Sequence, residues 1–374
     1  MSWFSWIFRR REPNPVAKVG APLGLTTIED RSLGCLLGVA CGDILGANVE
    51  KVSREEIKLW HGRVHNFLDS AGRPYGHYTD DTEMTLALAS SLVTVERIDG
   101  AHCSSNYAKF FARPPARGYG RATKQVLEAL NEGADYRYTG TLMIPTGSYA
   151  NGGVMRIAPV GIAFRNAPDV VLYKAVKIAL QATHVHPEGI DGAWLQAKIV
   201  GWLVKIEPKH FNSQVFLNWL QTVAKTEASR ASLIKLERAL REGWSTEKLL
   251  EEACAPDENG KVFQIRAVEA LTCALWSFIQ NYKDPEECIV QAVGLGGDSD
   301  TIGAIAGAQA GALHGTDWIP KRWYDNIENK PETGRDVIMD VARQLSKIDF
   351  RQIEEVPWPP NKSPYVKNPI IKPG

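Results

Sequence analysis

Two glycine stripes limit what this chain can fold into more than any other feature of its sequence. In two separate stretches with helical spacing of apolar residues, glycine stands at every fourth position. The first stripe comprises Gly34, Gly38, Gly42 and Gly46, and the second comprises Gly303, Gly307 and Gly311. Each glycine inside a helix costs about 1 kcal/mol relative to alanine, so a stripe indicates that another backbone approaches closely. We expect two central helices that pack against each other and bring their end loops into one cleft.

The remaining pattern predicts an all-α protein. Apolar residues recur at helical spacing over most of the chain, and no stretch shows a convincing alternation of apolar and polar residues. We find no linker between residues 30 and 345 that would separate two domains. The prediction is therefore an extended N-terminal arm over residues 1–30, a compact single-domain helical bundle over 31–345, and an extended C-terminal tail over 346–374.

Composition excludes several classes of function. Lys plus Arg and Asp plus Glu both number 43 in 374 residues, so a zero net charge gives no support for nucleic-acid binding. The six cysteines are scattered without the spacing of a zinc site, which indicates buried thiols in a reducing compartment. No run approaches the ~20 apolar residues of a transmembrane helix. The N-terminus inverts the order of a signal peptide, so we expect a cytoplasmic location.

Two acidic knots, TDDT at Thr79–Thr82 and GGDSDT at Gly296–Thr301, stand where helices are expected to begin. Helix capping explains one carboxylate in each knot, because Asp and Thr accept hydrogen bonds from free backbone N–H groups. Capping does not explain why each knot has a second carboxylate, Asp81 beside Asp80 and Asp300 near Asp298. Clustered carboxylates repel each other unless a cation neutralises them. Oxygen ligands without His or Cys favour Mg²⁺, Mn²⁺ or Ca²⁺ over zinc. The knots therefore predict a divalent metal site, with simple capping as the alternative.

Five motifs follow one another along the chain. They are GDILGANVE (Gly42–Glu50), YTDDTEM (Tyr78–Met84), NGGVMRIAP (Asn151–Pro159), THVHP (Thr183–Pro187) and GGDSDTIGAIAGAQAGALHG (Gly296–Gly315). In order and approximate spacing over residues 31–318, this set resembles the ADP-ribosylglycohydrolase family, which includes the dinitrogenase-reductase-activating glycohydrolases. The chain has Ser299 where the family usually has Thr. The resemblance implies an all-α domain whose cleft holds two Mg²⁺, with Mn²⁺ as an alternative, and removes ADP-ribose from modified protein side chains.

The resemblance also implies roles for individual residues. It implies metal binding by Thr79, Asp80, Asp81, Asp298, Asp300 and Thr301. It implies catalysis by Glu50, Asp81 and Asp300, with Glu50 as general base or acid. It implies substrate binding by Asn151, Gly152, Gly153, Met155 and His184. From the residues alone, Glu50 would be a solvated helix-end residue and His184 a loop or core histidine. Arginine is the expected acceptor, because the sequence looks closer to the bacterial branch of the family.

The N-terminal arm is not needed by the family core. In this arm, aromatic residues precede an arginine cluster. Such a combination suits binding to a protein or to a membrane surface. The simpler interpretation is a disordered tail. The residues concerned are Trp3, Phe4, Trp6, Arg9, Arg10 and Arg11. An alternative function follows, that of an immunity protein whose arm blocks an ADP-ribosyltransferase toxin. Blocking and hydrolysis are compatible with each other.

Overall fold

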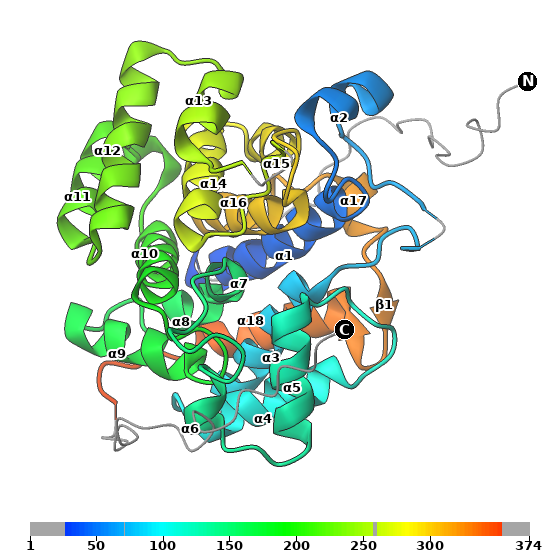
Figure 1. Cartoon of the computed structure of the whole chain (residues 1–374), viewed down its shortest axis with the longest axis vertical. Helices are drawn as coiled ribbons and strands as arrows, with labels where there is room; N and C mark the ends of the chain where they lie inside the picture. Colours follow the sequence, from blue (N-terminus) through cyan, green and yellow to red (C-terminus); the bar gives the residue numbers. More distant parts are fainter. Residues whose placement is uncertain (1–26, 71, 257–259, 354–374) are drawn as a thin grey trace, which may run out of the picture.

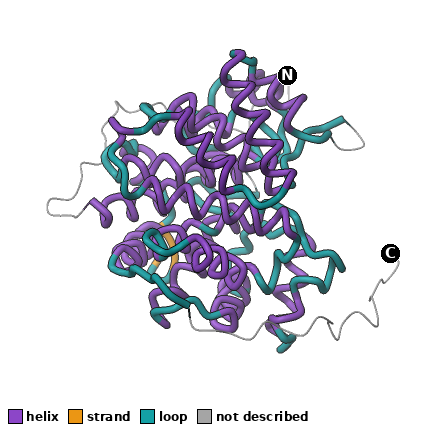
Figure 2. The backbone as a smooth tube through the Cα atoms, turned by 90° about the vertical axis from the view of Figure 1, so that its left-hand side faces the viewer, coloured by secondary structure: helices purple, strands orange, loops and turns teal. Residues whose placement is uncertain are grey.

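The structure is a computed structural model that describes residues 27–70, 72–256 and 260–353. Within these ranges it consists of α-helices, one short 3₁₀ helix and one antiparallel hairpin of β1 (Asn329–Lys330) and β2 (Thr333–Gly334), as Figures 1 and 2 show. The predicted all-α class is confirmed. The two strands have two residues each, too few for an alternating pattern to be visible in the sequence.

The helices of the described residues are, in chain order, α1 (Thr27–Ala47), α2 (Arg54–His61), α3 (Asp80–Val95), α4 (Gly100–Phe111), α5 (Arg121–Asn131), α6 (Tyr136–Thr139), α7 (Gly152–Arg156), α8 (Ala158–Ala163), α9 (Asp169–Leu180), α10 (Pro187–Leu203), η2 (Pro208–His210), α11 (Ser213–Val223), α12 (Glu227–Glu242), α13 (Thr246–Ala253), α14 (Ala267–Asn281), α15 (Pro285–Val293), α16 (Ser299–His314), α17 (Lys321–Tyr324) and α18 (Arg335–Ser346).

The two glycine-striped helices, α1 and α16, lie side by side at the centre of the molecule (Figure 1). A Cβ atom built on Gly38 would lie 2.1 Å from the carbonyl oxygen of Gly307, and one built on Gly42 would lie 2.0 Å from that of Gly303. The helices run antiparallel, since Gly34 meets Gly315 at one end and Gly46 meets Ser299 at the other. The predicted close packing of the two stripes is confirmed.

Further helices cover this central pair. Helices α14 and α15 pack against α16, while α18 and α3 pack against α1. Because α16 and nearly all of α1 are thus enclosed, their apolar residues form the middle of the hydrophobic core. No helix in the described part of the chain is long and apolar enough to cross a membrane. All six cysteines are buried and free, as predicted.

The ends of α1 are fixed by aspartates. Helix α1 begins at Thr27, and Asp30 in its first turn accepts hydrogen bonds from the backbone N–H (3.1 Å) and the hydroxyl (2.7 Å) of Thr316. Near the other end, Asp43 binds the start of α3. These two contacts tie the central pair to the loops on which the candidate site is built.

Candidate functional site

The antiparallel packing brings the end of α1 to the beginning of α16. A Cβ atom on Gly46 would lie 2.4 Å from the carbonyl oxygen of Ser299, so the two backbones touch there. Glu50 follows α1, and Asp298 and Asp300 stand at the start of α16. One carboxylate oxygen from each of these three residues lies within 4.8 Å of the others. The structure thus brings Glu50 to a pair of aspartates that follow it by about 250 positions in the sequence.

Asp43, a residue for which the sequence predicts no role, holds the other acidic knot beside the end of α1. Its fully buried carboxylate accepts hydrogen bonds from the backbone N–H of Thr79 (2.9 Å) and from both the backbone N–H (3.0 Å) and the hydroxyl (2.5 Å) of Thr82. Thr79 caps α3, and its hydroxyl lies 3.1 Å from a carboxylate oxygen of Asp81. Asp43 therefore holds the TDDT turn against α1. The signal available in the sequence was a lone carboxylate within an apolar, glycine-rich helix.

We predict that Asp43→Asn weakens the binding of divalent metal ions by about 10- to 100-fold, as is typical when a residue that orients metal ligands is lost. Asparagine keeps one acceptor oxygen, but its amide nitrogen cannot accept a hydrogen bond and would oppose an N–H group of Thr79 or Thr82, so the TDDT turn would be held less firmly. Isothermal titration calorimetry with MnCl₂ measures the effect. Asp30→Asn is the matched control, since Asp30 holds Thr316 at the opposite end of α1. If both variants bind metal equally well, Asp43 does not orient the site.

We call the five acidic residues at this point the acidic cluster, since Asp80 and Asp81 interact electrostatically with Asp298. The cluster comprises Glu50, Asp80, Asp81, Asp298 and Asp300. Burial raises the pKa of Asp80 to about 8, and the negative charge of Asp43 adds to this rise. Burial likewise raises the pKa of Asp298 to about 6. For Asp81 and Asp300, burial and the neighbouring carboxylates raise the pKa well above the ordinary value. Without a cation, the cluster therefore resists full ionisation.

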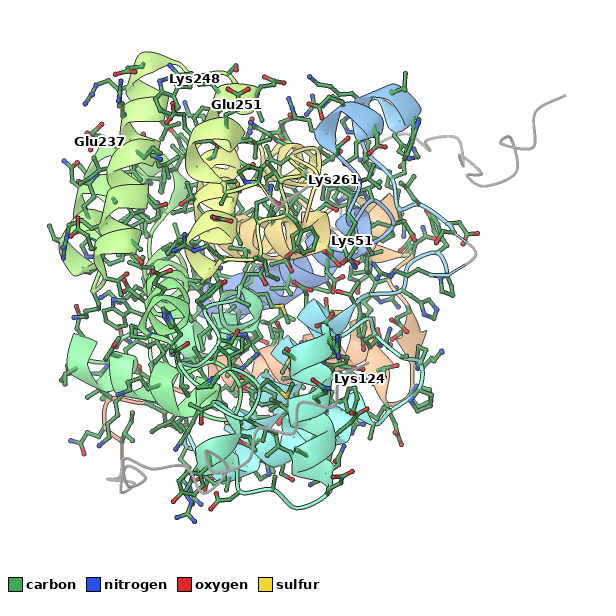
Figure 3. All side chains as sticks on the ribbon, in the orientation of Figure 1. Lys51, Lys124, Glu237, Lys248, Glu251 and Lys261 are labelled. Atoms are coloured by element: carbon green, nitrogen blue, oxygen red, sulfur yellow. The ribbon has the colours of Figure 1, made fainter. Side chains whose placement is uncertain are left out.

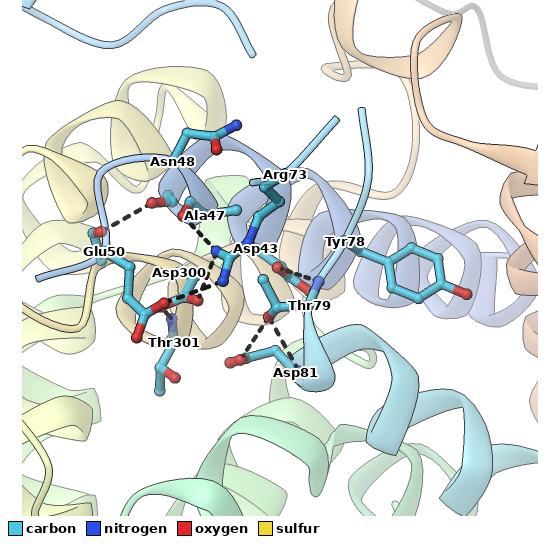
Figure 4. A network of polar contacts seen from close by, with 12 residues as sticks. Asp43, Ala47, Asn48, Glu50, Arg73, Tyr78, Thr79, Asp81, Asp300 and Thr301 are labelled. Atoms are coloured by element: carbon cyan, nitrogen blue, oxygen red, sulfur yellow. Dashed lines mark hydrogen bonds and ion pairs between the residues drawn. The ribbon is translucent and has the colours of Figure 1, made fainter. Parts of the chain in front are cut away.

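Two cationic side chains lie at one edge of the cluster. The guanidinium of Arg73 donates to the carbonyl oxygen of Ala47 and lies 3.3 Å from Glu50 and 3.8 Å from Asp300, as Figure 4 shows. The ammonium of Lys51 lies 2.8 Å from the other oxygen of Glu50, and its side chain, labelled in Figure 3, is largely exposed. These two cations offset part of the negative charge that the acidic cluster can carry.

The acidic cluster has the properties of a site for hard divalent cations. Its donors are carboxylate and hydroxyl oxygens, which Mg²⁺ and Mn²⁺ prefer. One carboxylate oxygen of Asp81 is buried without a hydrogen-bond partner among the described residues, and buried acceptors of this kind are rare unless a ligand satisfies them. The six residues predicted to bind metal all stand at the starts of α3 and α16. The arrangement fits a metal centre.

The residues predicted to bind substrate line a neighbouring region, and several contact the protein itself. The amide of Asn151 donates to Asp298 (2.5 Å) and to the carbonyl oxygen of Gln264 (2.9 Å), so this residue supports the acidic cluster directly. Gly152 faces the ring of His184, Gly153 faces Leu180, and Met155 is buried. His184 and Thr183 line a small pocket together with Met143, Ile144 and Ser148. The substrate roles of these residues stay predictions.

Two further residues position the cluster and were not predicted. The side-chain oxygen of Gln264 accepts a hydrogen bond from the backbone N–H of Asp298 (3.0 Å). The buried guanidinium of Arg117 lies 3.2 Å from Glu83 and donates to Glu328 and to the carbonyl oxygen of Tyr78 (3.1 Å). Arg117 thereby holds the residues on both sides of the TDDT turn, Tyr78 and Glu83. Both residues stand in loops whose sequences carry no periodic signal.

Comparisons with known proteins support this picture. The family model described as ADP-ribosylglycohydrolase matches residues 25–354. Human ADP-ribosylhydrolase ARH3 is 30% identical over 339 residues, which cover 81% of this chain and 90% of that protein. The ADP-ribosyl-[dinitrogen reductase] glycohydrolase of Rhodospirillum rubrum is 29% identical over 330 residues, covering 86% of this chain and 99% of that protein. A solved structure of an ADP-ribosylglycohydrolase-related protein complex superposes with a TM-score of 0.64 at 27% identity, covering 87% of this chain and all of that chain.

Proposed function

The chain belongs to the ADP-ribosylglycohydrolase family, and we propose that it is a Mg²⁺-dependent hydrolase that removes ADP-ribose from arginine side chains of modified proteins. Release of ADP-ribose from a modified substrate follows from the family. The finer assignment depends on one observation, the convergence of Glu50, Asp298 and Asp300 at the point where α1 meets α16. Two Mg²⁺ ions, or Mn²⁺ in their place, would be held by Thr79, Asp80, Asp81, Asp298, Asp300 and Thr301.

The residues of this chain divide the chemistry between them. When bound, the divalent cations supply positive charge that polarises oxygen atoms of the substrate. Glu50 then takes a proton from the attacking water, whose oxygen forms a bond to the anomeric carbon of the ribose. The bond from that carbon to the guanidine nitrogen breaks, and the proton passes to the leaving nitrogen. Asp81 and Asp300 would position the ribose indirectly, because they would hold the divalent cations that bind it.

Two acceptors suit different features of the site. The carboxylate of Glu50 favours a cationic acceptor such as arginine, because in the free protein it already pairs with a guanidinium, that of Arg73 at 3.3 Å. Arg73 favours a neutral hydroxyl acceptor, because its guanidinium lies 3.3 Å from Glu50 and repels a second guanidinium there. Arginine is the first candidate and a serine hydroxyl the second.

Proteins carrying ADP-ribose on arginine or on serine, incubated with and without Mg²⁺, distinguish these acceptors. The proposal expects release of free ADP-ribose from the arginine-linked substrate, and only with Mg²⁺ present. Release from the serine-linked substrate alone would replace arginine by the second candidate. Equal release in EDTA would rule out the proposed metal dependence.

The metal-free protein is predicted to lose stability as the pH rises from about 4 to about 8. In this window the folded state retains protons on Asp80 (pKa about 8) and Asp298 (pKa about 6) that an unfolded chain releases near pH 4. Since the folded state binds more protons, the free energy of unfolding falls as they dissociate. Added Mg²⁺ should raise the melting temperature more at pH 8 than at pH 5. Melting curves recorded in EDTA and in MgCl₂ at several pH values measure this. In EDTA, Asp80→Asn should make the melting temperature depend less on pH. A Mg²⁺ effect equal at both pH values would contradict the prediction.

The alternative function, an immunity protein that blocks an ADP-ribosyltransferase toxin, depends on Trp3, Phe4, Trp6, Arg9, Arg10 and Arg11, which lie outside the described residues. A deletion tests it, and the deletion should stop at residue 26, because α1 begins at Thr27 and Asp30 anchors Thr316. Toxin neutralisation that survives this deletion and is lost with Asp80→Ala would exclude blocking by the arm. Liposome flotation of the full chain tests membrane binding by the same segment. The cytoplasmic location stays a prediction.

A further inference from the structure

Arg156, at the end of α7, is buried in an unusual way for a cation. Its side chain is fully buried, yet its hydrogen bonds among the described residues go to uncharged groups and none goes to an Asp or Glu. One guanidinium nitrogen donates to the carbonyl oxygen of Gly152 (2.9 Å), and the group lies over the ring of Tyr107, 4.7 Å from its centroid. The other terminal nitrogen donates to the hydroxyl of Thr183. Burying a charge without a counter-ion is costly, so the position of Arg156 requires an explanation.

The hydroxyl of Thr183 connects Arg156 to His184. Arginine can only donate hydrogen bonds, so the Thr183 oxygen is the acceptor in its contact with Arg156. The single hydroxyl hydrogen then has two acceptors within reach, Nδ1 of His184 at 2.9 Å and the carbonyl oxygen of Leu180 at 3.5 Å. The shorter contact is the better hydrogen bond. With Nδ1 accepting, the proton of a neutral His184 ring stands on Nε2.

The Nε2 atom of His184 lies directly beside Gly152. A Cβ atom built on Gly152 would lie 3.0 Å from both Nε2 and Cε1, so any side chain at position 152 would crowd this edge of the ring. Gly152 follows Asn151, whose amide holds Asp298 of the acidic cluster. Arg156 therefore links the loop next to the metal centre with the ring of His184.

The ring is also kept uncharged. Burial lowers the pKa of His184 well below its ordinary value, and the positive charge of Arg156 lowers it further. A neutral imidazole with one N–H group is a directional donor, whereas a ring of undefined tautomer presents either a donor or an acceptor at the same atom. A carboxylate paired with Arg156 would weaken the effect of its positive charge on the pKa of His184. This explains why Arg156 is buried without a counter-ion.

We propose that Arg156 and Thr183 are positioning residues that fix His184 as an Nε2–H donor, directed at an oxygen acceptor of the ADP-ribose moiety. The acceptor is a ribose hydroxyl or a phosphate oxygen. This inference rests on the proposed function for its ligand, although the tautomer itself is a property of the free protein. It assigns a role in substrate recognition to two residues that lie behind the substrate-facing side chain.

The tautomer is measured directly by ¹⁵N-resolved NMR of the histidine rings in the wild-type protein without ligand, with the His184 signals assigned from a His184→Gln variant. The expected spectrum shows His184 neutral at pH 7, with the proton on Nε2 and an unprotonated Nδ1. A proton on Nδ1, or a charged ring, would overturn the inference. This outcome is independent of catalysis, so a wild-type protein that releases no ADP-ribose but shows the Nε2–H tautomer would contradict only the proposed function.

A matched pair of variants tests the role of the hydroxyl. Thr183→Val keeps the side-chain shape but breaks the link, and should weaken binding of free ADP-ribose about tenfold, the effect of losing one well-oriented hydrogen bond. Thr183→Ser keeps the hydroxyl and should stay within about twofold of the wild type. Calorimetric titration with ADP-ribose gives both affinities, and the ¹⁵N spectrum of Thr183→Val should no longer show the Nε2–H form alone. Equal affinity in both variants with an unchanged His184 spectrum would contradict the proposed link, and if Thr183→Val does not fold, the wild-type spectrum still decides.

Discussion

Asp300→Asn is expected to lower the rate of ADP-ribose release by about a thousandfold or more. Asp300 is almost fully buried at the start of α16, and one of its oxygens lies within 4.8 Å of oxygens from Glu50 and Asp298. Asparagine keeps the side-chain shape and the oxygen that accepts the hydrogen bond from the backbone N–H of Thr301 (3.0 Å). The substitution therefore tests the effect of the negative charge by itself. Without that charge the site binds a divalent cation less tightly and holds the ribose less well. Single-turnover release from an ADP-ribosylated protein measures the rate.

The matched control is Asp191→Asn, which neutralises a fully buried aspartate far from the acidic cluster in the chain. Asp191 accepts hydrogen bonds from the backbone N–H groups of Lys225 and Thr226, at the start of α12. Its replacement should lower the melting temperature and leave the rate of release unchanged. Asp300→Asn should behave in the opposite way, because the variant removes a carboxylate whose pKa is raised by burial and by its neighbours. Undiminished turnover of Asp300→Asn at saturating Mg²⁺ would show that the cluster is not the catalytic site.

The sequence was sufficient to predict the frame of the site, because that frame depends on local rules. A glycine repeat of four residues matches the helical period, and Asp–Thr pairs mark helix starts. The resulting predictions, that α1 and α16 pack closely and that both acidic knots begin helices, are confirmed. The domain boundaries at residues 30 and 345 stay predictions, although α1 begins at Thr27, inside the predicted arm.

The supporting residues could not be predicted from local rules, since their partners are distant in the chain. Asp43 binds residues 36 and 39 positions away, and Gln264 binds Asp298 34 positions away. The predicted substrate contact of Asn151 stays a prediction, and the hydrogen bond from its amide to Asp298 is an additional role that the sequence did not indicate. In each case the residue type allowed several partners, and only the packing of the helices selects one.

The second large effect is expected from Gly307→Ala, which should lower the free energy of unfolding by about 3 kcal/mol or more. A methyl group at this position would lie 2.0 Å from the carbonyl oxygen of Gly38, less than the distance of any ordinary contact. Alanine is the better helix former by about 1 kcal/mol, but both partners here are backbone atoms that cannot move aside alone. The overlap therefore outweighs the gain in helix propensity, and α16 must shift away from α1. Urea unfolding followed by circular dichroism measures the loss.

The same substitution should also reduce activity without touching a residue of the acidic cluster. Position 307 lies seven residues beyond Asp300 on α16, roughly 10 Å along the helix axis, so a shift of α16 moves Asp298 and Asp300 relative to Glu50. Gly72→Ala is the control, because Gly72 is exposed and a Cβ atom there would meet nothing within 4 Å. It should change stability by less than about 0.5 kcal/mol. A Gly307→Ala protein as stable as the Gly72→Ala control would mean that the two backbones do not touch. In that case the glycine stripes would not be what brings the acidic residues together.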